Sequence, residues 1–187
     1  MDIKIKVKGP DSIDVATTLN NIGTLYWNKG DYVKALEQFN NCLNIQTKIR
    51  GADSINVATM LNNIGSVYDN IGDYVNALEH YKKSLEIKIK IKGADSIDVV
   101  TTLNNIGTVY FNKGDYTKAL EHFNKSLEIR IKIKGSESID VATMLNNIGC
   151  LHKKIGDYAK ALEHFNECLE IRTKILGSDS ATVQSLI

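Results

Sequence analysis

Apolar residues recur at helical spacing along the chain. In the first such segment they are Val15, Leu19, Ile22 and Tyr26. These positions are three or four residues apart, which is the period of one face of an α-helix. A second apolar run follows and stops at Gly51. The pattern predicts an A helix over about residues 15–28 and a B helix that begins after Asp31, packed together as a hairpin.

Residues that favour helix ends stand at the ends of both predicted helices. Asp11 and Ser12 precede the A helix, and Asp31 precedes the B helix. Short polar side chains of these types cap helix N-termini. Gly30 and Gly51 follow the two helices, where glycine adopts a left-handed backbone at low cost.

The hairpin recurs four times with a period of 42 residues. Asn-Asn-Ile-Gly ends at Gly23, Gly65, Gly107 and Gly149, and Gly-Asp-Tyr begins at Gly30, Gly72, Gly114 and Gly156. Residues 53–94 and 95–136 differ at 12 of 42 aligned positions. Because the units share one sequence pattern, we expect them to share one backbone.

One segment taken alone would be predicted as a strand. Residues 87–92 alternate isoleucine and lysine, which is the period of a half-buried strand. The repeat instead places them at the end of a B helix, where Ile87 and Ile91 share a face. A B helix needs two apolar faces, since it packs against its own A helix and against the next unit. A strand remains an alternative for residues 1–8.

The units resemble the tetratricopeptide repeat, whose pattern is a bulky residue followed at set offsets by Leu-Gly, Tyr, Ala and Phe. The first unit supplies Leu19, Ile22, Gly23, Tyr26, Ala35 and Phe39. The family often has Trp in place of Leu19, and the fourth unit has His152 in place of Tyr. The usual repeat has about 34 residues. We assign the additional residues to a longer B helix and its loop.

The 42-residue form is similar to the repeats of kinesin light chains, with Thr-Leu-Asn-Asn in the A helix and a B-helix ending such as Leu127 to Lys132. The resemblance implies an all-α fold, a tetratricopeptide α-solenoid whose antiparallel helix pairs form a right-handed superhelix. The expected organisation is residues 1–13 as the remnant of a preceding B helix and linker, repeats at 14–50, 56–92, 98–134 and 140–176, and residues 177–187 as the start of an incomplete fifth repeat.

Composition excludes several classes of partner. The 187 residues carry 23 basic and 22 acidic side chains, and a net charge of +1 gives no electrostatic reason to bind nucleic acid or an anionic membrane. No apolar stretch approaches the ~18 residues of a membrane span, and the N-terminus lacks the apolar core of a signal peptide. Cys42, Cys150 and Cys168 form no C-x-x-C pair. We therefore expect a cytoplasmic protein with reduced cysteines.

The A helices of such arrays line the concave surface. The residues expected to bind there are Asn20, Asn62, Asn104 and Asn146, with Trp27 and Phe111. By resemblance, these asparagines stand where kinesin light chain repeats hold a peptide main chain, and an amide can both donate and accept hydrogen bonds. The two aromatic residues would add apolar anchors. The alternative, that they are ordinary lone surface aromatics, has equal weight, because such residues are common. The second asparagine of each pair, such as Asn63, is expected to serve structure.

Other candidate residues give no indication of catalysis. His80, His122 and His164 recur 42 residues apart, too far apart for one hairpin to bind a metal ion with them, and are expected at the surface. The sequence contains no glycine-rich phosphate loop, HExxH motif or nucleophile elbow. We expect no enzyme activity, no cofactor and no metal site.

The resemblance thus implies a protein–protein interaction module or scaffold that binds a protein or an extended peptide in the concave groove, as in cargo or adaptor recognition. Two alternatives remain open. The chain could be a structural or self-associating repeat array, or the regulatory repeat region of a larger signalling protein. We expect a monomer, with end-to-end association as the alternative.

Overall fold

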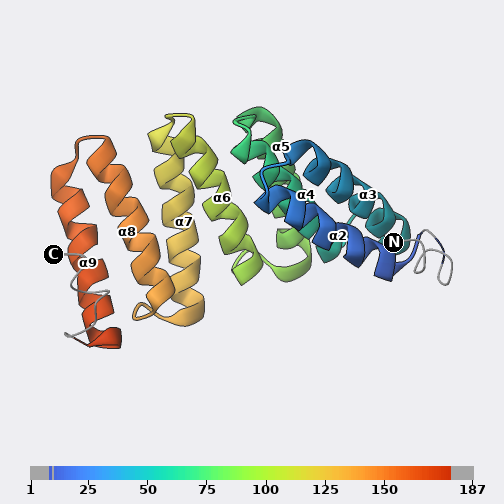
Figure 1. The fold of residues 1–187 in the computed structure, drawn as a ribbon. Helices are drawn as coiled ribbons and strands as arrows, with labels where there is room; N and C mark the ends of the chain where they lie inside the picture. Colours follow the sequence, from blue (N-terminus) through green and yellow to red (C-terminus); the bar gives the residue numbers. More distant parts are fainter. Residues whose placement is uncertain (1–8, 10, 178–187) are drawn as a thin grey trace. The chain divides into compact units, whose positions relative to one another are not determined.

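The computed structural model describes residues 9 and 11–177, and eight α-helices account for most of them (Figure 1). The helices are α2 (Ile13–Asn28), α3 (Tyr32–Arg50), α4 (Ile55–Asn70), α5 (Tyr74–Lys92), α6 (Ile97–Asn112), α7 (Tyr116–Lys134), α8 (Ile139–Lys154) and α9 (Tyr158–Leu176). The described residues contain no strand, which confirms the all-α prediction. The expectations for residues 1–8 and 178–187 lie outside the described residues.

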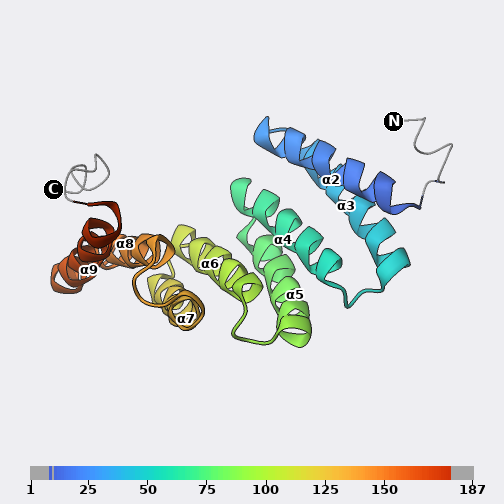
Figure 2. The same cartoon turned by 90° about the horizontal axis from the view of Figure 1, so that it is seen from below.

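The helices form two compact units, unit 1 (Met1–Ala94) and unit 2 (Asp95–Ile187). Each unit contains two hairpins, and each hairpin pairs an A helix (α2, α4, α6 or α8) with the B helix that follows it (Figures 1 and 2). Within unit 1 the A helix α4 also packs on α3, and within unit 2 α8 packs on α7. A B helix therefore buries two faces, as the sequence predicted. The hand of the expected superhelix stays a prediction.

The A helices begin at serine caps, two residues earlier than predicted. The Val15 amide donates to Ser12 Oγ over 3.3 Å, and the equivalent bond reaches Ser54 and Ser138 in two later repeats. Asp11, the other candidate cap, instead pairs with Lys48 at the far end of the same hairpin, 3.0 Å away. The same pairing recurs as Asp53–Lys90, Asp95–Lys132 and Glu137–Lys174. These exposed pairs link the two ends of each hairpin.

The B helices begin at aspartate caps and end at glycine. Asp31 accepts a hydrogen bond from the Lys34 amide, and the equivalent aspartate caps each of the other B helices. The Lys34 side chain bonds to the same carboxylate and holds its pKa below the ordinary value. Gly30 and Gly51 have φ values of +76° and +81°, as the predicted turns require. Residues 87–92 are helical, so the prediction against a strand is confirmed.

In each described hairpin a glycine of the A helix faces an aromatic ring of the B helix at close range. A Cβ atom added to Gly107 on α6 would stand 2.7 Å from the Phe123 ring of α7. The same conflict, at 2.7–2.9 Å, recurs for Gly23 with Phe39, Gly65 with Tyr81 and Gly149 with Phe165. The ring thus occupies the space that a side chain would need, and the glycine sets the distance between the helices.

A small residue of the B helix makes a second close contact in three of the described hairpins. The buried Cys42 thiol donates to the Ala16 carbonyl over 3.1 Å. Ser84 and Ser126 make the equivalent bond to Ala58 and Val100 with their hydroxyl groups. Burial raises the pKa of Cys42 to about 11. Cys42 therefore occupies a structural position that serine also fits.

Replacing Gly107 by alanine is expected to destabilise the protein by about 1–3 kcal/mol, because the added methyl group would displace the Phe123 ring. The direction of this change is informative, because replacing glycine by alanine in an unconstrained helix stabilises the helix by about 1 kcal/mol. Urea unfolding measures the change. Thr101→Ala, at an exposed position of the same helix, is the control and should lie within about 0.5 kcal/mol of the parent. A stabilised Gly107→Ala variant would contradict the packing argument.

Tyr81 offers a second test, because the other three repeats have Phe at its position. Its hydroxyl group lies 2.9 Å from Ser66 Oγ, and burial raises the pKa of Tyr81 to about 12. Tyr81→Phe keeps the ring and should reduce the free energy of unfolding by about 0.5–1.5 kcal/mol. A double-mutant cycle with Ser66→Ala should show coupling. Strictly additive single effects would mean that the two hydroxyl groups do not stabilise each other.

Candidate functional site

Side chains of the A helices border two adjacent pockets in unit 2. The first, of about 210 Å³, is lined by Thr101 and Asn104 of α6, Thr143 and Asn147 of α8, and the side chains beneath them. The second, of about 270 Å³, is lined by Thr108, Phe111, Phe123, Asn147 and Cys150. Asn147 borders both pockets, so they form one strip along α6 and α8. We call this strip the α6–α8 surface.

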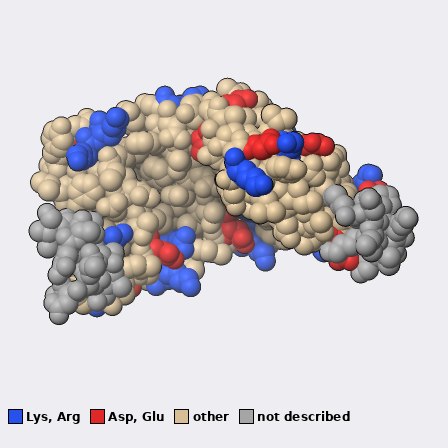
Figure 3. Space-filling view, in the orientation of Figure 1, with Lys and Arg blue, Asp and Glu red and all other residues tan. Residues whose placement is uncertain are grey.

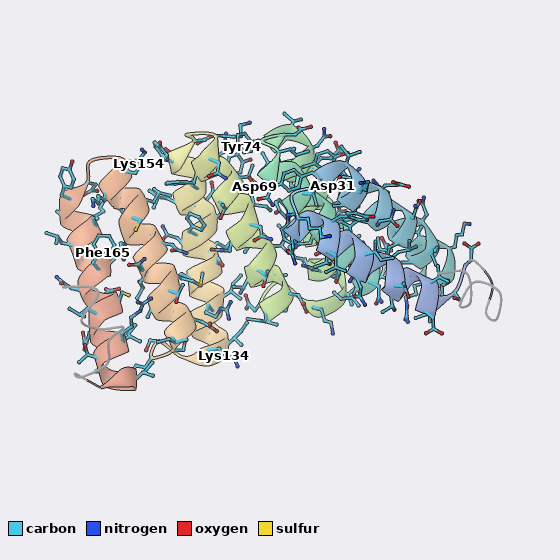
Figure 4. The ribbon with its side chains drawn as sticks, in the orientation of Figure 1. Asp31, Asp69, Tyr74, Lys134, Lys154 and Phe165 are labelled. Carbon is cyan, nitrogen blue, oxygen red and sulfur yellow. The ribbon has the colours of Figure 1, made fainter. Side chains whose placement is uncertain are left out.

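The first pocket is polar but electrically balanced. Arg130 of α7 reaches its wall and donates from Nη1 to Asp140 Oδ2 of α8 over 2.8 Å. The other polar groups that line the pocket are uncharged: the amides of Asn104 and Asn147 and the hydroxyl groups of Thr101, Ser126 and Thr143. On the face of unit 2 visible in Figure 3, uncharged atoms cover most of the surface and charged atoms lie toward its edges. Lys154, at the end of α8, lies at one such edge (Figure 4).

The second pocket is more apolar. The half-buried Phe111 ring lies at the rim, and its centroid is 5.7 Å from that of the Tyr116 ring. The buried Phe123 ring, held against Gly107, forms the floor. Cys150 is exposed and lies 4.0 Å from the Asn146 side-chain amide. An uncharged side chain of modest size would therefore find apolar surface here beside hydrogen-bonding groups.

The candidate residues of unit 1 are engaged in the protein itself. The Asn63 amide of α4 donates to Asn20 Oδ1 of α2 over 3.2 Å, so the second asparagine of the pair joins two repeats. The structural role expected for Asn63 is thus a bond between two side chains of neighbouring repeats. The Trp27 ring is half-buried against a cluster that includes Phe39 and Val67, and thus contributes to the packing of α4 on α3. Asn62 is half-buried on α4.

The structure therefore separates the six predicted residues. Asn104 and Phe111 line neighbouring pockets of the α6–α8 surface, with Asn146 beside Cys150 at its edge. Asn20 and Trp27 contact the adjoining repeat within unit 1. Sequence reasoning missed Asn147, which was expected to serve structure, although it is exposed on α8 and borders both pockets. The one signal in the sequence for this exposure is that Asn147 belongs to α8, the last of the described A helices.

The hydroxyl groups along the A helices bond to their own backbone. Thr101 Oγ1 donates to the Ile97 carbonyl and Thr108 Oγ1 to the Asn104 carbonyl, over 3.3 and 3.0 Å. Their methyl groups and the lone pairs of their oxygen atoms remain for contact with a ligand. The amides of the asparagines are consequently the stronger candidates for binding.

The prediction that His80, His122 and His164 lie at the surface is wrong. All three are half-buried, because each histidine ring of a B helix packs on an aromatic ring of the A helix in the same hairpin. The ring centroids are 5.2 Å apart for Tyr68 and His80, 5.4 Å for Tyr110 and His122, and 5.4 Å for His152 and His164. Within the residues that the structure describes, no group of His, Cys, Asp or Glu side chains could hold a metal ion.

Comparison with known proteins explains the repeated hairpin. The sequence model of the tetratricopeptide repeat family matches residues 6–90 and 98–174. The chain is a tetratricopeptide repeat protein. The repeat fold is typically a non-enzymatic interaction scaffold. A search of curated proteins finds no match. Among the described helices of this tetratricopeptide repeat protein, none is both long and apolar enough to cross a membrane.

Solved structures share the fold of this tetratricopeptide repeat protein at low sequence identity. BtubC (BKLC) from P. vanneervenii superposes with a TM-score of 0.80 at 24% identity, covering 89% of this chain and 66% of its own. The putative kinesin light chain repeats of Podosopora anserina give 0.80 at 16% identity, covering 96% and 84%. Aspartyl phosphate phosphatase F from Bacillus subtilis gives 0.78 at 16% identity, covering 93% and 44%. The likeness to kinesin light chain repeats predicted from the sequence is confirmed.

The buried His152 is expected to make stability fall in acid. Burial lowers its pKa below 6.5 and the neighbouring His164 adds to the effect, which together outweigh the attraction of Asp157, 3.7 Å away. Because the unfolded state takes up the proton first, the contribution of neutral His152 is complete above pH 6.5 and is lost as the pH falls from there toward the lower folded pKa.

Thermal unfolding between about pH 7.5 and pH 5, spanning the usual histidine pKa, tests this expectation. His152→Tyr restores the residue of the other repeats and should flatten the pH dependence relative to the parent. Parallel curves for the parent and the variant would contradict the assignment to His152.

Proposed function

We propose that this protein is an interaction scaffold that binds an extended peptide on the α6–α8 surface. The observation that supports the proposal best is the pair of adjacent pockets that share Asn147. One pocket offers uncharged amides and the other an aromatic rim and floor. A polar pocket next to an apolar one suits an extended peptide, because main-chain polar groups and side chains alternate along such a peptide.

Asn104 and Asn147 are the residues proposed to bind the peptide main chain. They belong to neighbouring A helices and border one pocket, so their amides can bond to successive N–H and C=O groups. Such contacts recognise the main chain and tolerate many peptide sequences. Phe111 and Phe123 would select among those peptides, because their pocket favours an apolar side chain of the ligand.

The low charge of the surface limits the class of ligand. Arg130 and Asp140 pair with each other and their charges balance, so together they give no net attraction to an acidic or basic peptide. Lys153 and Lys154 are exposed at the end of α8 and could contact an acidic residue of the ligand there. We therefore propose a ligand with a neutral central segment that contains at least one apolar residue.

The regulatory alternative is a second proposal, and the only observation that bears on it is that this chain covers 44% of the length of aspartyl phosphate phosphatase F, so the same fold also occurs within a longer protein. It proposes that the repeats serve a larger signalling protein that also contains a nucleotide-binding domain. Reading the sequence that flanks these residues in the gene distinguishes the two proposals, and a peptide ligand would be compatible with either.

Asn104→Ala is expected to weaken binding of a selected peptide by about 5-fold to 100-fold, because a lost hydrogen bond to a desolvated partner is worth about 1–3 kcal/mol. The ligands are peptides selected from a random library on the unaltered protein and then labelled for fluorescence anisotropy. Phe111→Ala should weaken those with an apolar central residue.

Asn124→Ala is the matched control, since it makes the same change at an exposed position on the B helix α7. Its affinity should stay within about 2-fold of the parent, as expected for a residue outside the interface. Equal affinities for Asn104→Ala, Phe111→Ala and the control would exclude this surface as the binding site.

A further inference from the structure

The first and last helices that the structure describes, α2 and α9, expose faces that are more buried in the equivalent helices of the other repeats. On α9, Tyr158 and Leu162 are 65% and 61% exposed. The equivalent residues of α3 are Tyr32 and Leu36, which are half-buried because α4 packs over them. We define the outer face of α9 as Tyr158, Leu162, Phe165 and Leu169; Phe165 is labelled in Figure 4.

The first helix shows the complementary exposure. Leu25 of α2 is 62% exposed, whereas Val67 and Leu151, at the same repeat position in α4 and α8, are completely buried. Ile22 is half-buried, while its equivalents on α4 and α8 are inaccessible to solvent. We define the outer face of α2 as Thr18, Ile22 and Leu25.

The packing within unit 1 shows how such faces fit. Ile64 and Val67 of α4 lie in one buried cluster with Phe39 of α3, and Tyr32, Leu36 and Leu43 pack around it. The outer face of α9 repeats the α3 side of this cluster as Tyr158, Leu162, Phe165 and Leu169. The outer face of α2 repeats the α4 side as Ile22 and Leu25. The first and the last described helix thus each carry one half of an interface that the chain already forms internally.

We propose that the outer face of α9 binds the outer face of α2 in a second copy of this chain. The contact joins different faces, so it is heterologous and extends the array head to tail. Leu25 of one copy lies between Tyr158 and Leu162 of the next, as Val67 lies among the α3 side chains within one copy. This inference concerns the ends of the array and does not depend on the peptide-binding surface.

Charged residues of α9 and α2 also correspond to an ion pair that forms between two repeats within the chain. Arg130 of α7 bonds to Asp140 of α8 at 2.8 Å, where one repeat meets the next in unit 2. Arg172 on α9 and Asp14 on α2 stand at the same repeat positions. In the head-to-tail contact they face each other across the two copies. Opposite charges at this point favour the same register that the internal repeats have.

Sedimentation equilibrium of the full chain tests the proposal, with Leu25→Lys and Leu162→Lys as the interface variants. Val33→Lys is the matched control, because Val33 is 80% exposed on α3 even though α4 packs on that helix. The average mass of the parent and the control should rise above 20.8 kDa as concentration increases from about 10 µM to about 1 mM, the range expected for a small interface. Each interface variant should associate on the order of 10-fold more weakly or not at all.

Mixing the two interface variants gives the sharper result. Leu25→Lys keeps an intact α9 and Leu162→Lys keeps an intact α2, so the mixture should form a complex of two chains and nothing longer. Circular dichroism confirms that each variant is folded. A parent chain that stays at 20.8 kDa at every concentration overturns the proposal. So does a Leu25→Lys variant that associates as strongly as the parent, since that would indicate contact between two α9 faces.

Discussion

The close approach of each A helix to its B helix is the constraint on which the rest of the structure depends. Two small residues on the A helix, Ala16 and Gly23 in the first repeat, face Cys42 and Phe39. Since they lie seven residues apart, the two contacts are about two helical turns apart and define both the distance and the alignment of the pair. A hairpin held at two points presents its remaining faces in a fixed geometry, and so the next repeat can pack on it in the same way.

Much of the fold could be predicted from the sequence, because its determinants are local. Ser12, Asp31, Gly30 and Gly51 act through their own backbone or that of residues within one turn, so their types alone indicate where helices begin and end. The 42-residue repeat then indicated that residues 87–92, whose alternation of isoleucine and lysine is typical of a strand, belong to a helix. The pairing of Asp11 with Lys48 could not be predicted in this way, since it depends on how the two helices of a hairpin lie side by side.

The candidate site was less predictable, because equivalent residues meet different neighbours. Asn63 and Asn147 occupy the same repeat position, yet Asn63 bonds to Asn20 while Asn147 borders two pockets. Trp27 and Phe111 are likewise equivalent, and one packs against the adjoining repeat while the other rims a pocket. The histidines were misjudged for a related reason. Their polarity suggested the surface, but a flat ring packs well on the tyrosine of the partner helix.

The uneven burial of the three cysteines has a practical consequence. Cys42 and Cys168 are buried, and burial raises the pKa of both thiols, so neither presents a reactive thiolate near neutral pH. Cys150 is exposed beside Phe111 and Asn147. A thiol-selective fluorophore would consequently attach at this one position in the native chain. The protein thus carries a built-in labelling point at the rim of a pocket, from which the arrival of a ligand can be followed optically without engineering a new cysteine.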